Sequence, residues 1–135
     1  MHSFKFSVSL RFFGLNVDPD IICQQLERSP KWKNKMGDPR KGPGGQALGG
    51  VYDRHYCSFK LADKQDGELH EFLEKTLTDL MRHASTFELI NKSGDRAELF
   101  IGWYSPGNTG AILDSSLLRK MGELNIDLAL DVYGS

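Results

Sequence analysis

Hydrophobic and polar residues alternate at both ends of the chain. Near the N-terminus the apolar side chains occupy every second position, at Phe4, Phe6, Val8, Leu10 and Phe12. Near the C-terminus the same spacing holds for Ile126, Leu128, Leu130 and Val132. A period of two with a single apolar face is typical of a strand packed on one side only, whereas strands buried on both faces read as continuous apolar runs. The two segments therefore predict an antiparallel or mixed sheet, and interior strands are expected at residues 51–61 and 97–104.

Apolar residues at three- and four-residue spacing predict helices between these strands. The first helix is expected at about residues 19–28, because Asp18 can cap it and Pro19 suits a first helical position. The second begins near Glu68. The predicted buried residues of these two helices are Ile21, Ile22 and Leu26, and then Leu69, Phe72, Leu73, Leu77, Leu80 and Met81.

Two more helical segments follow in the second half of the chain. Ser85 and Glu88 have the spacing of a capping box, which predicts a short extra turn that ends by Gly94. The last helix is expected to start after Asp114 or the residue that follows it, and to stop near Asn125. Its predicted buried residues are Leu117, Leu118, Met121 and Leu124.

The fold class predicted from these elements is α+β. We expect one domain over residues 1–135, with an antiparallel or mixed sheet of four to six strands and helices mainly on one face. A ferredoxin-like arrangement is the first guess for its topology. The exception to the regular pattern is an irregular Gly/Lys/Arg-rich loop at about residues 31–50, inside which a small strand is left open.

Composition places the chain among ordinary soluble globular proteins. It is 39% hydrophobic and 26% charged and has no apolar run long enough to cross a membrane. Because no export signal is recognised, the expected location is the cytoplasm, where Cys23 and Cys57 would be reduced thiols. A disulfide between them is the alternative. Charge is uneven: residues 1–60 hold ten Lys/Arg and five Asp/Glu, and residues 61–135 hold seven and thirteen.

Basic residues gather in and before the irregular loop. They are Arg28, Lys31, Lys33, Lys35, Arg40 and Lys41, with Trp32 among them. Cations around an aromatic ring suit a phosphate backbone and a stacked base. A pI of 6.4 is nevertheless low for a nucleic-acid domain, and an acidic protein partner would fit the same residues. A solvated basic loop with no partner is the plainest alternative.

The wetter face of the predicted sheet is a second candidate surface. Alternation along the interior strand places Tyr52, Arg54, Tyr56 and Lys60 outward, where they would join Arg11, Tyr104 and Tyr133. RNA-recognition sheets stack bases on such aromatics, but no RNP-like string is present. In a small domain, outward tyrosines are more often covered, here by the 31–50 loop or by a partner subunit. The residues we expect to bind are Trp32, Lys33, Arg40, Lys41, Arg54 and Tyr56.

No motif of reaction chemistry stands out. The stretch GPGGQALGG lacks the Lys-Ser/Thr ending of a P-loop. His55 and Cys57 share one face of a strand and are the candidates for a small-molecule or hydrolytic site under this loop. We predict no metal site, no cofactor and no catalytic residue, and we interpret Glu68, Glu71 and Glu74 as the solvent face of a helix.

Two stretches resemble a known family. The opening SLRFFG followed by DPDIICQQLERSP, and the ending SSLLRKMGELNIDLALDVYG, resemble a bacterial domain-of-unknown-function family, DUF4279. A tryptophan expected on the second interior strand is replaced here by the region around Tyr56 and Phe59. The resemblance implies a small α+β domain and brings no catalytic residues.

Three functions are open at this point. The leading hypothesis is a non-enzymatic protein-binding module, immunity-like or regulatory, with a protein partner; a homodimer is a further option. The second is a nucleic-acid-binding module that uses the basic segment 28–41. The third is the small-molecule or hydrolytic site.

Overall fold

A mixed five-stranded sheet forms the centre of the protein. The computed structural model describes residues 4–134, and its strands lie in the order β2-β5-β1-β6-β7. Their bounds are β1 Lys5–Gly14, β2 Trp32–Asn34, β5 His55–Gln65, β6 Arg96–Tyr104 and β7 Ile126–Tyr133. Neighbouring strands run antiparallel except for the parallel pair β6 and β7. The predicted α+β class with a mixed sheet is confirmed.

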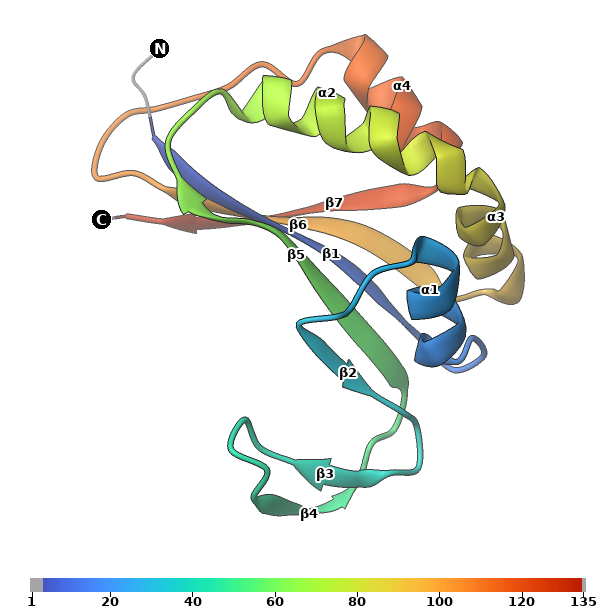
Figure 1. Ribbon diagram of the computed structural model, residues 1–135. Helices are drawn as coiled ribbons and strands as arrows, with labels where there is room; N and C mark the ends of the chain where they lie inside the picture. Colours follow the sequence, from blue (N-terminus) through green and yellow to red (C-terminus); the bar gives the residue numbers. More distant parts are fainter. Residues whose placement is uncertain (1–3, 135) are drawn as a thin grey trace.

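All the helices lie on one side of this sheet (Figure 1). They are α1 Pro19–Leu26, α2 Leu69–Leu80, α3 Ala84–Ser93 and α4 Ser115–Glu123, with one 3₁₀ turn, η1, at Met81–His83. The core lies between the two layers, because alternate strand residues meet the apolar stripes of the helices. Its largest fully buried side chains include Phe6, Phe12, Phe59, Phe87, Leu73, Leu99 and Ile101.

The ferredoxin-like topology is not confirmed. That fold has the element order β-α-β-β-α-β, in which two strands follow each other without a helix. Here at least one helix stands between each long strand and the next: α1 after β1, α2 and α3 after β5, and α4 after β6.

Local signals placed most of the helix ends correctly. Asp18 accepts a hydrogen bond from the backbone N–H of Asp20, and Asp114 accepts one from Leu117. Gly94 ends α3 in a left-handed conformation with φ of 88°. The predicted capping box at Ser85 is wrong, since α3 is a ten-residue helix whose first turn has no side-chain cap.

Three apolar residues predicted to be buried are exposed. Ile21, Met81 and Leu118 lie on the outer sides of their elements. Each follows or precedes a buried residue in the sequence. Adjacent residues of a helix point in different directions, so only one of the two is buried against the core. The first helix also ends at Leu26 rather than near residue 28.

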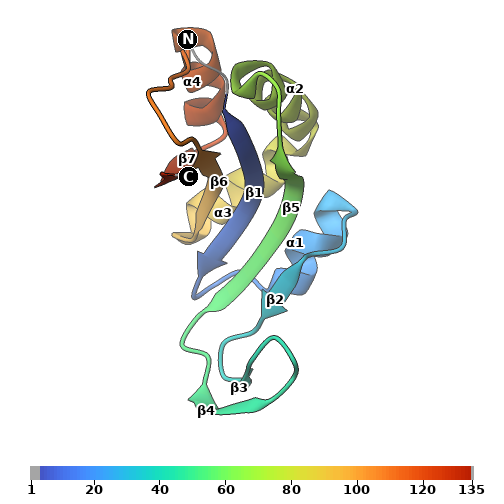
Figure 2. The same ribbon diagram turned by 90° about the vertical axis from the view of Figure 1, so that its left-hand side faces the viewer.

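The 31–50 segment is built differently from the predicted irregular loop. Its first part, β2, joins the edge of the sheet beside β5. The rest forms a separate hairpin of β3 Pro39–Lys41 and β4 Ala47–Val51. The interior strand β5 therefore starts at His55 instead of residue 51. The hairpin extends beyond the ends of the long strands, and its backbone does not lie across them (Figure 2).

In the described part of the chain, no helix is both long and apolar enough to cross a membrane.

Candidate binding surface on the open sheet face

The side of the sheet opposite the helices, here called the open face, carries aromatic side chains from all five strands. Figure 2 looks onto this face. Alternation along each strand places these side chains on it: Trp32 on β2, Tyr56 on β5, Phe13 on β1, Phe100 and Tyr104 on β6, and Tyr133 on β7. Most are half-buried, and Tyr133 is 43% exposed. Such rings give a large apolar contact area with polar edges.

The strand register brings the aromatic residues of β2, β5 and β1 together on the open face. Tyr56 pairs with Phe13 across β5 and β1, and Trp32 pairs with Ser58. The guanidinium carbon of Arg54 lies 5.0 Å from the centre of the Phe13 ring, within the range of a cation–π contact. The indole N–H of Trp32 donates to Asn34 Oδ1 over 3.1 Å. These contacts orient the rings without burying them.

At the centre of the open face, Arg11 is held by Glu98. Arg11 Nε donates to Glu98 Oε1 over 2.7 Å, and its Nη2 contacts the same oxygen. The Arg11 guanidinium carbon also lies 4.1 Å from the centre of the Phe100 ring. Glu98 is only 9% exposed, so its carboxylate contacts Arg11 and is poorly accessible to a ligand. The positive charge of Arg11 is thus neutralised within the sheet.

The far end of the face is a tyrosine stack. The rings of Tyr104 and Tyr133 lie 4.8 Å apart and 9° from parallel, and Lys64 Nζ lies 4.4 Å from the Tyr104 ring. Gly102 makes room for this arrangement, since a Cβ there would lie 2.5 Å from Ser7 Oγ and 2.9 Å from Tyr104 Oη. The predicted association of Arg11, Tyr104 and Tyr133 on one face agrees with this placement.

The predicted binding residues do not all share this surface. Trp32, Arg54 and Tyr56 lie on it or at its edge. Arg40 and Lys41 lie on β3 of the hairpin, where both are exposed. Tyr52, expected on the sheet, belongs to the hairpin as well: its hydroxyl donates to the Lys41 carbonyl and accepts from the Lys41 N–H, both over 3.1 Å.

Lys33 points to the other side of the sheet from Trp32, so it is not part of the open face. Lys33 Nζ and Lys35 Nζ each lie 2.6 Å from a carboxylate oxygen of Asp20 at the start of α1. The hydrogen bonds from Lys33 and Lys35 lower the pKa of Asp20 to about 2. The basic cluster predicted from the sequence is therefore divided, and two of its six cations, Lys33 and Lys35, are neutralised by Asp20.

The His55–Cys57 pair has no feature of a reactive site. Cys57 is fully buried, and burial raises the pKa of its thiol to about 12. His55 Nδ1 accepts a hydrogen bond from the backbone N–H of Met36 over 3.1 Å. This hydrogen bond holds the segment between β2 and β3 against the start of β5.

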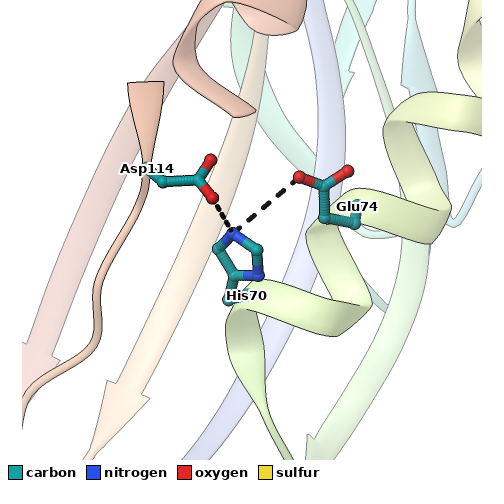
Figure 3. A group of neighbouring side chains, drawn as sticks. All are labelled: His70, Glu74 and Asp114. Carbon is teal, nitrogen blue, oxygen red and sulfur yellow. Dashed lines mark ion pairs between the residues drawn. The ribbon is translucent and has the colours of Figure 1, made fainter. Parts of the chain in front are cut away.

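A second polar cluster joins α2 to α4. His70 Nε2 lies 3.1 Å from Asp114 Oδ2 and 3.8 Å from Glu74 Oε1 (Figure 3). The three ligand-type atoms lie within 4.8 Å of one another, a spacing that one divalent cation could span. Lys120 Nζ lies 2.9 Å from the other Glu74 oxygen and opposes a cation there. As built, the cluster is an ionic link between two helices, so the interpretation of Glu74 as a solvent-face residue is wrong.

Comparison with protein families identifies the chain. The family model Domain of unknown function (DUF4279) matches residues 2–135. The chain belongs to the DUF4279 family. No curated protein and no solved structure matches this DUF4279 domain.

Sequence reasoning missed parts of this site. Phe13 and Phe100 were not among the predicted binding residues, although alternation places both on the open face; their neighbours Tyr56 and Arg11 follow only from the strand order. The His70–Glu74 spacing of four residues was visible, but Asp114 comes from a distant part of the DUF4279 chain. An i,i+4 pair alone is common on helix surfaces and does not signal a third partner.

Proposed function

We propose that this DUF4279 domain is a non-enzymatic protein-binding module that recognises its partner through the open face and the adjoining hairpin. The observation that carries the proposal is the set of half-exposed aromatic rings on a sheet face that no helix or loop of residues 4–134 covers. Tyrosine, tryptophan and arginine are the residues that dominate the energetics of protein interfaces. Here Trp32, Arg54 and Tyr56 lie together on that face.

The charge distribution favours a protein over a nucleic acid. Binding to a phosphate backbone depends on cations that are free to replace counterions. On the open face Arg11 is paired with Glu98, Lys60 with Asp63, and Arg96 with Asp127. These three pairs cancel part of the positive charge of the face, and a face of this kind with exposed aromatic rings suits a mixed polar and aromatic contact.

The remaining cations indicate the character of the partner. Among residues 4–134, no carboxylate forms an ion pair with Arg40, Lys41, Arg54 or Lys64. A partner that places acidic side chains around a central apolar contact would satisfy them and would be guided to this side of the domain. Such a module in the cytoplasm fits an immunity-like or regulatory role, in which binding alone changes the partner's activity.

The test starts from capture of partners out of native cytoplasm, with and without nuclease and at two salt concentrations. The captured protein is identified, purified and titrated against the wild type and against Arg54→Glu and Tyr56→Ala. Arg119→Glu is the matched control, since it makes the same charge change on an exposed residue of the helical layer. We expect the open-face variants to weaken binding at least tenfold and the control to change it less than twofold.

Two results would overturn the proposal. One is a titration in which the open-face variants bind as well as the control. The other is capture that disappears with nuclease and falls steeply with salt, which would favour the nucleic-acid alternative.

A further inference from the structure

β7 forms one edge of the sheet, and no strand within residues 4–134 pairs with its outer side. It is eight residues long and pairs with β6 in a regular register without a bulge. It contains no proline and no lysine, the residues that commonly block edge strands. The opposite edge, β2, is only three residues long. A long regular edge presents a row of backbone groups that can pair with another strand, and we propose that a second copy of this chain fills it by antiparallel pairing of β7 with β7.

The backbone direction of β7 follows from one hydrogen bond. The N–H of Ser105, just after β6, donates to the carbonyl of Tyr133 over 3.0 Å. The backbone groups of Tyr133 therefore face β6, and those of every second residue before it do the same. The residues whose N–H and C=O groups face the free edge are Ile126, Leu128, Leu130 and Val132.

The same residues carry the apolar side chains of β7. Leu130 is 49% exposed and Val132 is 67% exposed, although both project toward the helical side of the sheet. The helical layer does not cover this end of the strand. A second strand at the edge would cover both side chains and satisfy the free backbone groups in the same step.

One register makes β7 complementary to itself. With Leu130 opposite its own copy, Leu128 meets Val132 on the helical side. On the open-face side Ala129 then lies opposite Asp131, and Asp127 lies opposite Tyr133. The facing backbone groups belong to hydrogen-bonded pairs, as antiparallel pairing requires.

Registers shifted by two residues are disfavoured. One places Asp131 opposite its own copy, and the other places Asp127 opposite Asp131. Like charges directly across two strands are destabilising. The Leu130-centred register avoids both contacts while it keeps the apolar pairs, so the charge pattern selects it.

The two-fold axis of this pairing is perpendicular to the sheet, and the two open faces lie on the same side. The dimer is a property of the β7 edge and does not depend on the proposed function of the open face. If the dimer does not form, the titrations that test the open face keep their meaning, because their variants do not lie on β7.

Sedimentation velocity of the full chain over a range of concentrations tests the dimer. We expect a concentration-dependent dimer in the wild type and at least tenfold weaker association in Leu130→Lys, which sets two ammonium groups face to face. Leu48→Lys on β4 is the matched control because Leu48 is 50% exposed, and it should dimerise like the wild type. A melting temperature equal to that of the wild type at dissociating concentration shows that Leu130→Lys still folds.

Ala129→Lys tests the register. It sets a lysine opposite Asp131 of the second copy at two symmetric places, and we expect association to tighten about three- to tenfold at low salt and to return toward wild type at high salt. In one shifted register the two lysines would face each other and weaken the dimer. The proposal fails if the wild type is monomeric throughout, if Leu130→Lys dimerises like Leu48→Lys, or if Ala129→Lys weakens association.

Discussion

A Cβ atom on Gly14 would lie 2.2 Å from Cγ of Asp95, so the end of β1 is in direct contact with the start of β6 through this carboxylate. Asp95 is 8% exposed. Its oxygens accept the backbone N–H of Val17 over 2.8 Å and that of Asn16 over 3.2 Å. The turn that leads from β1 into α1 is therefore built around one side chain from a distant part of the chain.

Gly14→Ala should destabilise the protein more than a normal surface change. The added methyl group would displace the Asp95 carboxylate and leave the N–H groups of the turn without their partner, at a cost of about 2–4 kcal/mol in the free energy of unfolding. Urea denaturation measures it. Gly122→Ala is the matched control: apart from its chain neighbours and its own helix backbone, no atom of residues 4–134 lies within 4 Å of the added Cβ. Because the residue is helical, a gain of about 0.5–1 kcal/mol is expected. Equal midpoints for Gly14→Ala and the wild type would contradict this account.

This contact shows which parts of the fold are readable from the sequence. The helix start at Asp18-Pro19 was predicted because it is a local signal. The reason for the glycine was not readable, since Asp95 lies far away in the sequence. The same limit applies to Asp20 on α1, which pairs with Lys33 on β2 and with Lys35 just after β2.

The candidate site was readable only in part. Alternation correctly placed Tyr56, Tyr104 and Tyr133 on one sheet face. It could not give the strand order, which decides that Arg11 meets Glu98. Composition also failed to predict that 31–50 forms an edge strand and a hairpin, because glycines permit both a loop and tight turns.

Acid should loosen the attachment of β2 to α1. The pKa of Asp20 is lowered from 3.8 to about 2 by its hydrogen bonds with Lys33 and Lys35. A depressed carboxyl pKa contributes stability that is present above the unfolded value and is lost as pH falls through the folded value. The loss is therefore expected between about pH 4 and pH 2, and it should be reduced in Asp20→Asn and by high salt.

Denaturant midpoints at pH 5 and pH 2.5 measure this difference. Asp53→Asn is the matched control, because Asp53 forms no ion pair among residues 4–134 and its removal should leave the acid dependence unchanged. The effect should be modest, since the Asp20 pairs are exposed to solvent. An acid dependence that is the same in Asp20→Asn and in the wild type would show that these pairs do not stabilise the fold.

The thiol of Cys57 should be inert in the folded protein. Burial raises its pKa to about 12, so the reactive thiolate is almost absent at pH 8. Burial also raises the pKa of Cys23, which is partly exposed on α1. With Cys23→Ser as the background, a disulfide reagent should modify Cys57 only as fast as the protein opens, and rapidly once urea unfolds the chain. With Cys57→Ala as the background, Cys23 should react slowly in the folded state and faster than Cys57. Fast modification of Cys57 in the folded protein would contradict this prediction, because it would show that the thiol reaches solvent. The hypothesis of a reactive site at His55 and Cys57 would then stand again.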